Sequence, residues 1–111
     1  MNIKDFFDIY DFQDCNIKSI INKEKDLLMG IEIFNWRQPG YIKSEPEIGY
    51  KTIVFKNVKK VHKELDNNEF NDGIREAYLF KLSRDEYRVR LVMVNKGVKT
   101  IEFVTNDVEM I

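Results

Sequence analysis

The alternation of apolar and polar side chains predicts strands through most of the chain. It is clearest in residues 27–34, where every second side chain is apolar, the period expected of a strand with one buried face. These apolar positions are Leu27, Met29, Ile31 and Ile33. Residues 17–23 form a second strand-like segment, and the charged turn between the two segments predicts a hairpin. Tyr50 to Val58 is a further predicted strand.

The first ten residues have the spacing of a short helix instead. One side of the helical wheel is apolar, the opposite arc is acidic, and Asn2 with Asp5 matches an N-cap and its partner in the first turn. The apolar side holds Ile3, Phe6, Phe7 and Tyr10, and the opposite arc holds Asp5, Asp8 and Asp11. Because like charges repel at this spacing, the helix depends on docking its aromatic side.

Residues 58–65 fit two patterns. They have apolar or aromatic residues at i, i+3, i+4 and i+7, as on a helix face: Val58, Val61, His62 and Leu65. The β-branched residues and the short length also fit a bulged strand, which we favour. In either case Lys59, Lys60 and Lys63 are expected in water, and residues 66–73 are expected to form a polar loop.

In the last third of the chain, one pairing register makes three predicted strands agree. With turns at residues 83–86 and 95–97, apolar side chains lie opposite one another across both ladders. The pairs are Tyr78 with Leu91, Phe80 with Val89, Val89 with Phe103 and Leu91 with Ile101. The same register pairs Arg90 favourably with Glu102, and Lys81 unfavourably with Arg88.

The other face of these three strands is partly apolar and partly basic. Its apolar residues are Leu79, Val92, Val94, Val98 and Val104. A contiguous apolar patch of this kind seldom stays bare on a monomer. We therefore expect the helix, a second sheet or another chain to cover part of this face.

A long loop with aromatic residues interrupts the strand pattern at residues 35–49. It contains both prolines of the chain and carries Trp36, Arg37 and Tyr41, with Tyr50 directly after it. Trp, Tyr and Arg dominate interface hot spots because they bury large areas with few rotamers or offer several directed donors. Trp36 fits equally a plug at the end of the core, whereas Arg37 and Tyr41 are expected to be exposed.

Composition supports one mainly β domain covering residues 1–111. A chain of 111 residues has room for one compact core, and Ala, the best helix former, occurs once. We therefore expect antiparallel sheets that form a small sandwich or half-barrel, with a minor helical part in the short N-terminal helix. Whether there is one sheet or two stays open.

The charges nearly cancel, with 18 Lys and Arg against 19 Asp and Glu. Residues 1–50 hold six bases and nine acids, net −3, and residues 51–111 hold twelve and ten, net +2. This balance argues against binding to nucleic acid through bulk charge. No apolar run is long enough to span a membrane, and the first residues do not resemble a secretion signal, so we expect a cytoplasmic protein.

Few residues offer catalytic or metal-binding chemistry. His62 is the only imidazole and Cys15 the only thiol, so a Cys–His pair would need these two side chains to converge in a cleft. A zinc site needs several Cys or His, and the row Asp5, Asp8, Asp11, Asp14 lacks the pattern of a calcium loop. The sequence predicts no enzyme, no metal and no cofactor.

Several segments resemble small bacterial immunity proteins of polymorphic toxin systems, nearest to the immunity protein 50 family. The matching segments are FQDCNIKSI from Phe12, LLMGIEIFNW from Leu27, IVFKNVKKVHKE from Ile53 and the closing IEFVTNDVEMI. The likeness is carried by Phe12, Asp14, Ile17, Phe55 and Val58. Where the family pattern has Gly this chain has Asn57, which tolerates a positive φ. The resemblance implies a cytosolic, non-enzymatic protein that binds one toxin.

These observations predict a protein-binding module, with the immunity protein as its leading form. The predicted partner-binding residues lie in the long loop and on the acidic row: Trp36, Arg37, Tyr41, Tyr50, Asp8, Asp11 and Asp14. The alternative is a structural or homo-oligomeric accessory protein of a Gram-positive bacterium, a homodimer whose outer C-terminal face pairs with itself. Neither hypothesis requires nucleic acid or a membrane.

Overall fold

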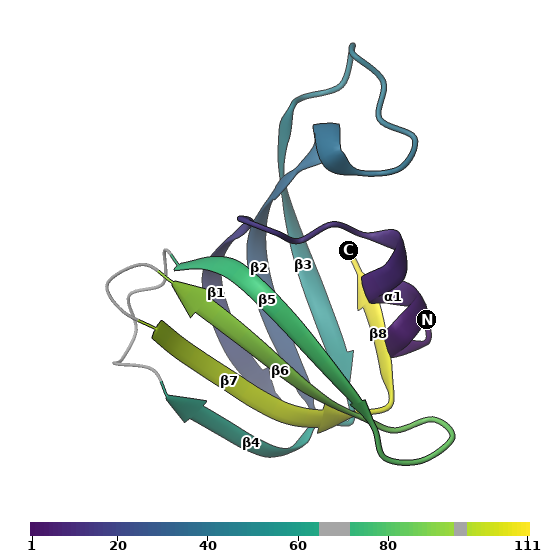
Figure 1. The fold of residues 1–111 in the computed structure, drawn as a ribbon, viewed down its shortest axis with the longest axis vertical. Helices are drawn as coiled ribbons and strands as arrows, with labels where there is room; N and C mark the ends of the chain where they lie inside the picture. The colour runs from purple at the N-terminus through teal and green to yellow at the C-terminus, as the bar shows by residue number, and fades with distance from the viewer. Residues whose placement is uncertain (65–71, 95–97) are drawn as a thin grey trace.

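One antiparallel sheet and one short helix make up the described part of the chain. A computed structural model describes residues 1–64, 72–94 and 98–111. The elements are α1 (Ile3–Ile9), β1 (Asn16–Lys23), β2 (Asp26–Phe34), the 3₁₀ turn η1 (Asn35–Arg37), β3 (Ile48–Lys56), β4 (Lys59–Glu64), β5 (Asp72–Lys81), β6 (Tyr87–Val94), β7 (Val98–Thr105) and β8 (Asp107–Met110) (Figure 1). The expected mainly β fold with a short N-terminal helix is confirmed.

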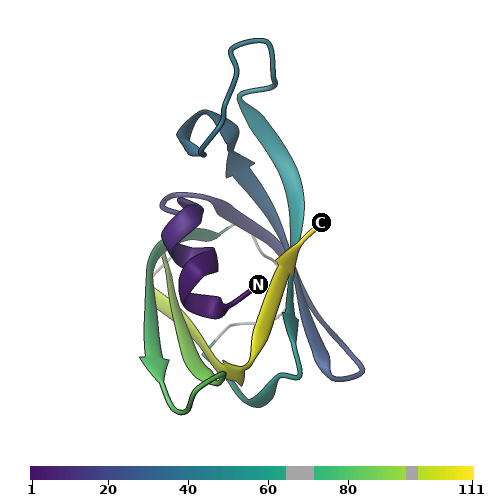
Figure 2. The ribbon, with the colours of Figure 1, turned by 90° about the vertical axis from the view of Figure 1, so that its right-hand side faces the viewer.

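The eight strands have the order β4-β7-β6-β5-β1-β2-β3-β8. β4 follows β3 after two residues, and β8 follows β7 after Asn106, so each pair acts as one bent strand. These bent strands pair with each other, with Lys56 opposite Asp107 on one side of the bend and Lys59 opposite Val104 on the other. The single sheet therefore curves over itself in two layers around the core, and the expected sandwich or half-barrel is built from one sheet (Figures 1 and 2).

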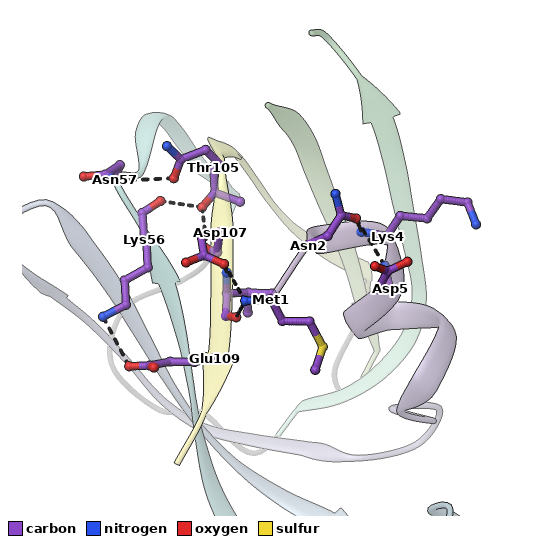
Figure 3. Close-up of polar contacts among 11 residues, drawn as sticks. Met1, Asn2, Lys4, Asp5, Lys56, Asn57, Thr105, Asp107 and Glu109 are labelled. Atoms are coloured by element: carbon purple, nitrogen blue, oxygen red, sulfur yellow. Dashed lines mark hydrogen bonds and ion pairs between the residues drawn. The ribbon is translucent and has the colours of Figure 1, made fainter. Parts of the chain in front are cut away.

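Four side chains stabilise the bend, those of Asn57, Asn106, Asp26 and Thr105. Asn57 takes a positive φ of 49° there, which Asn tolerates better than most residues, and its side-chain amide donates to Asn106 Oδ1 at 3.3 Å. The backbone N–H of Asn57 donates to Asp26 Oδ1 at 3.2 Å. The hydroxyl of Thr105 donates to the carbonyl of Lys56 (Figure 3). The left-handed residue thus lets β3 turn into β4 without leaving its donors unsatisfied.

Helix α1 lies between the two layers and closes the side of the core near β8 (Figure 2). Asn2 Oδ1 accepts hydrogen bonds from the backbone N–H groups of Lys4 and Asp5, at 2.8 and 3.3 Å, which confirms the expected N-cap. Ile3 and Phe6 are fully buried. The helix is therefore held by its apolar side, as expected from the repulsion among its aspartates.

The predicted hairpin and the strand after it are confirmed. In β2 buried and half-buried residues alternate strictly, with Leu27, Met29, Ile31 and Ile33 inward. β1 pairs with β2 through residues 16–23, and β3 begins at Ile48, two residues earlier than expected. Of the segment expected at residues 58–65, Lys59–Glu64 is strand rather than helix, with a bulge between Lys59 and His62 where Lys60 has a φ of 54°, and Leu65 lies outside the described residues.

Two expected connections fall partly or wholly outside the described residues. Of the loop expected at residues 66–73, residues 66–71 lie outside them, and Asp72 and Gly73 already belong to β5. The turn expected at residues 95–97 also lies outside them. The turn expected at residues 83–86 is present, closed by the N–H groups of Leu82 and Ser83, which both donate to the carbonyl of Glu86.

The register expected for the last three strands is half right. Between β6 and β7 it is confirmed, with Val89 opposite Phe103, Leu91 opposite Ile101 and Arg90 opposite Glu102. Between β5 and β6 it is wrong by one residue. Leu79 lies opposite Val89, Ala77 opposite Leu91 and Phe80 opposite Arg88, while Lys81 pairs with Tyr87.

The shift of one residue turns Tyr78 and Phe80 outward, where they are 44% and 47% exposed. A bulge between Ile74 and Glu76 lets Ile74 stay buried while the rest of β5 changes phase. Both faces of residues 77–80 are apolar, so the hydrophobic pattern could not select the face. The outer face also differs from expectation at Leu79, which points inward, and at Val104, which is buried beside β4.

Candidate functional site

The end of the β2–β3 hairpin projects beyond the rest of the sheet (Figure 1). Directly paired residues of antiparallel strands share a face, so the pairs Phe34–Ile48 and Glu32–Tyr50 lie on the outer face, opposite the core residues of β2. The Trp36 ring packs against the Phe34 ring, with 6.2 Å between centroids. We call Phe34, Trp36, Ile48 and Tyr50 the aromatic arm surface.

Three of its four side chains are open to solvent, while Phe34 is half-buried. Trp36 is 50% exposed, Ile48 45% and Tyr50 75%. Of the two interpretations of Trp36, the core plug is therefore wrong and the exposed ring is confirmed. The side chain of Tyr50 is exposed enough for a partner to contact it.

The guanidinium of Arg37 packs against the Trp36 ring and holds it in place. Its guanidinium carbon lies 4.8 Å from the Trp36 ring centroid and 5.5 Å from that of Phe34, within the range of a cation–π contact. Arg37 Nη1 also donates to the carbonyl of Gln13 at 3.0 Å and lies 3.7 Å from a carboxylate oxygen of Asp14. Arg37 is thus half-buried rather than exposed as expected, and it positions its neighbour.

Gln38 was not predicted from the sequence as a site residue. It links the projecting end of the β2–β3 hairpin, which we call the arm, to the segment after α1. Its side-chain oxygen accepts from the backbone N–H of Asp11 at 2.9 Å, and its amide nitrogen donates to the carbonyls of Asp11 and Phe34 at 2.7 and 3.1 Å. A neutral amide in a loop has no sequence pattern that predicts such a pairing. These hydrogen bonds fix the loop that carries Trp36.

The predicted acidic row divides between two places. Asp14 joins Arg37 at the base of the aromatic arm surface, where its φ of 64° turns the chain into β1. Asp8 and Asp11 face another way and line a cleft between the end of α1 and β5. Asp8 also makes an exposed ion pair with Lys4 on the same helix, at 2.7 Å.

Tyr41 lies apart from Tyr50. It is half-buried rather than exposed, and its hydroxyl donates to the carbonyl of Glu45 at 3.3 Å. It lines a pocket of about 270 Å³ together with Ile33 and Lys51, which belong to the inner face of the arm. The structure therefore groups Trp36, Arg37 and Asp14, places Tyr50 on the same outer face of the hairpin, and leaves Tyr41 on the other side.

The two candidate nucleophile and base residues lie in different parts of the sheet. Cys15 is fully buried before β1 and donates its S–H to the carbonyl of Asp11 at 3.8 Å, and this burial raises the pKa of the thiol. His62 is exposed on β4, which β7, β6 and β5 separate from β1. A raised pKa is the reverse of what activates a cysteine nucleophile.

Across residues 1–64, 72–94 and 98–111, no three His, Cys, Asp or Glu side chains are grouped so that they could hold a metal ion. In the same ranges no helix has the length and apolarity to cross a membrane.

Comparison with known proteins gives no relative. No family model matches the chain, and neither curated proteins nor solved structures give a significant match.

Proposed function

We propose that this chain is a protein-binding module that holds its partner against the aromatic arm surface, and that the partner is a toxin domain which it neutralises. The observation that carries the proposal is the Trp36 ring, which is half exposed and yet fixed by Arg37. The resemblance to immunity proteins supplies the class of partner.

Ordering a flexible side chain at an interface costs free energy. An aromatic ring already held in place loses little conformational freedom on binding, while it buries a large area against the partner. Arg37 fixes Trp36 through its ring contact, and Gln38 and Asp14 fix the loop on which both lie. The arm projects, so a partner can reach this surface without contacting the rest of the sheet (Figure 1).

The proposal is tested by neutralisation. Each candidate toxin domain from the source genome is expressed in a host with the wild-type chain or with Trp36→Ala, Tyr50→Ala or both, and growth and the Kd of the purified pair are measured. We expect Trp36→Ala to weaken binding about 30-fold, the effect of a hot-spot loss of about 2 kcal/mol. Neutralisation that survives the double substitution would contradict the proposal, as would failure of the wild type to neutralise.

Tyr78→Ala is the matched control, because Tyr78 is also an exposed tyrosine but lies on β5, outside the arm. We expect it to leave Kd unchanged. If Tyr78→Ala abolished binding and Tyr50→Ala did not, the partner would bind the outer face of β5, β6 and β7 instead.

That outer face supports the second candidate function, a homo-oligomeric accessory protein. Tyr78, Phe80 and Val98 are 44%, 47% and 73% exposed around a hollow of about 360 Å³. Glu76 and Arg90 lie in the same hollow, so the face carries both charge signs, as a self-complementary interface requires. Sedimentation across a wide concentration range is the test, and a monomer throughout would rule this candidate out.

A further inference from the structure

Within residues 1–64, 72–94 and 98–111, strand β5 has a backbone edge without a strand partner over most of its length. β1 pairs with β5 only at Asn16–Gly73 and Ile17–Asp72, and two further backbone hydrogen bonds join Ile74 to Asp14 and Cys15. Among the described residues, β5 beyond this point pairs with β6 alone. About 20 Å of strand edge, residues 75–81, is left open at the usual rise per residue.

The other outer edges of the sheet are protected in ways that natural sheets use. β4 carries Lys59, Lys60 and Lys63 and a bulge. The free side of β8 is occupied by Met1, whose carbonyl accepts from the N–H of Val108 at 3.1 Å and whose amine contacts Asp107 at 2.6 Å (Figure 3). By contrast, residues 77–80 in the middle of the β5 edge carry no charge.

A cleft runs along this edge. The cleft lies between β5 and a second segment, made of the end of α1 and the residues that follow it. Helix α1 and β5 face each other in Figure 2. Its volume of about 660 Å³ is within the range of about 300–1,000 Å³ that ligand pockets occupy. Phe7, Ala77 and Leu79 supply apolar lining.

The charged residues of the cleft are mostly acidic. Asp8, Asp11 and Glu76 line it together with one cation, Arg75. Asp8 is paired with Lys4 in an exposed contact that solvent screens, and the hydroxyl of Tyr78 donates to Glu76. Three carboxylates against the Arg75 guanidinium and the Lys4 ammonium leave a formal charge of −1, which favours a cationic occupant.

We propose that this cleft binds an extended, basic segment of a partner protein, which adds to β5 as a further strand between β5 and α1. The open backbone edge supplies hydrogen bonds that do not depend on the partner's sequence. Alternate side chains of the segment contact Phe7 and Leu79, and the side chains between them place lysine or arginine near Asp8 and Glu76. The site does not include the residues of the aromatic arm surface, so it is a second contact.

The probe that tests strand addition is an acetylated, amidated octapeptide of alternating lysine and valine. Its control has the same side chains but N-methyl groups on alternate amides along one edge, which removes the donors that a strand needs. Binding to the full chain is measured by calorimetry, and amide hydrogen exchange is measured with and without peptide. We expect the control to bind at least tenfold more weakly, and the peptide to slow exchange at residues 76–80.

Four results would overturn the proposal. Equal binding of the two peptides would show attraction by charge alone, and protection outside β5 would show another site. No binding of the peptide at millimolar concentration would show that the edge does not accept a strand. A concentration-dependent dimer of the free chain with slowed exchange at residues 76–80 would assign the edge to a second copy instead.

Variants of the chain separate the edge from the surrounding charge. Ala77 is exposed, so Ala77→Trp should fold and fill the cleft, and we expect it to weaken peptide binding at least tenfold. The pair Asp8→Asn and Glu76→Gln should weaken it severalfold, while Asp85→Asn, an exposed acid in the β5–β6 turn, should not. Unchanged binding in Ala77→Trp would contradict the proposal, whereas failed neutralisation by Trp36→Ala concerns only the aromatic arm surface.

Discussion

At the scale of single residues, burial decides what a reactive side chain does. Cys15 contacts no water, and its S–H donates to the carbonyl of Asp11. Desolvation disfavours the thiolate and so raises the pKa of Cys15 in the folded protein. The thiol therefore behaves as a small apolar side chain at the junction of the Asp11–Asp14 segment with β1.

This raised pKa has a consequence for stability at alkaline pH. The unfolded thiol ionises near pH 8.5 and the folded thiol at a higher pH, so stability that is present below the unfolded pKa is lost as pH rises through the folded pKa. We expect the free energy of unfolding of wild type to fall relative to Cys15→Ala between pH 8 and 10, by at most about 1.4 kcal/mol per unit. Urea denaturation of both chains measures this, and parallel pH profiles would contradict it.

At the scale of elements, β5 shows how a bulge changes which side chains a strand buries. Ile74 before the bulge is buried, and Tyr78 and Phe80 after it face outward while Leu79 packs against the core. The change of phase creates both the outer face of β5 and the lining of the cleft beneath it. One extra residue in the strand thus produces two surfaces that a regular strand would not have.

The register of β5 predicts unequal costs for two phenylalanines. Phe103 is fully buried and packs against Phe55, with ring centroids 4.7 Å apart, whereas Phe80 is 47% exposed. We expect Phe103→Ala to lower the free energy of unfolding by about 3–5 kcal/mol and Phe80→Ala by less than about 1 kcal/mol. Urea denaturation measures both. Comparable losses of unfolding free energy would show that Phe80 is buried, as in the register expected from the sequence.

At the scale of the whole molecule, the sheet is held unevenly. β2 pairs with β3 over eight consecutive residue pairs, from Leu27–Phe55 to Phe34–Ile48. The seam between β1 and β5 has two pairs and the backbone bonds to Ile74. The two layers are therefore joined firmly through the bent strands and weakly through this seam.

We expect the seam to open locally before the rest of the sheet. The N–H of Ile74, which donates to the carbonyl of Cys15 at 2.8 Å, should exchange with solvent faster than the N–H of Ile31 in the middle of β2. Hydrogen exchange resolved by residue measures both amides in one sample. Equal protection of the two would mean that the seam opens only with global unfolding.

The site was predictable where a residue type carries its own chemistry. Trp36 and Tyr50 could be chosen as candidate recognition residues because large aromatics are rare in polar loops and frequent in interfaces, and both are exposed. The hydrogen bonds that fix the loop carrying Trp36 were not predictable, because those between Gln38 and Asp11 join residues 27 positions apart. The division of the acidic row had the same cause, since spacing cannot show that Asp14 meets Arg37 while Asp8 faces β5.

The sequence by itself determined the strands, the capped helix and the strict alternation of β2, because these depend on neighbours within a few residues. It favoured the bulged strand after Asn57 over a helix but did not decide between them, and the structure shows the strand, with Asn57 at a positive φ. Only the tertiary structure decided which face of β5 is buried, since residues 77–80 are apolar on both sides. It likewise decided that one sheet forms both layers, and that the weak β1–β5 seam leaves an open edge beside an acidic cleft.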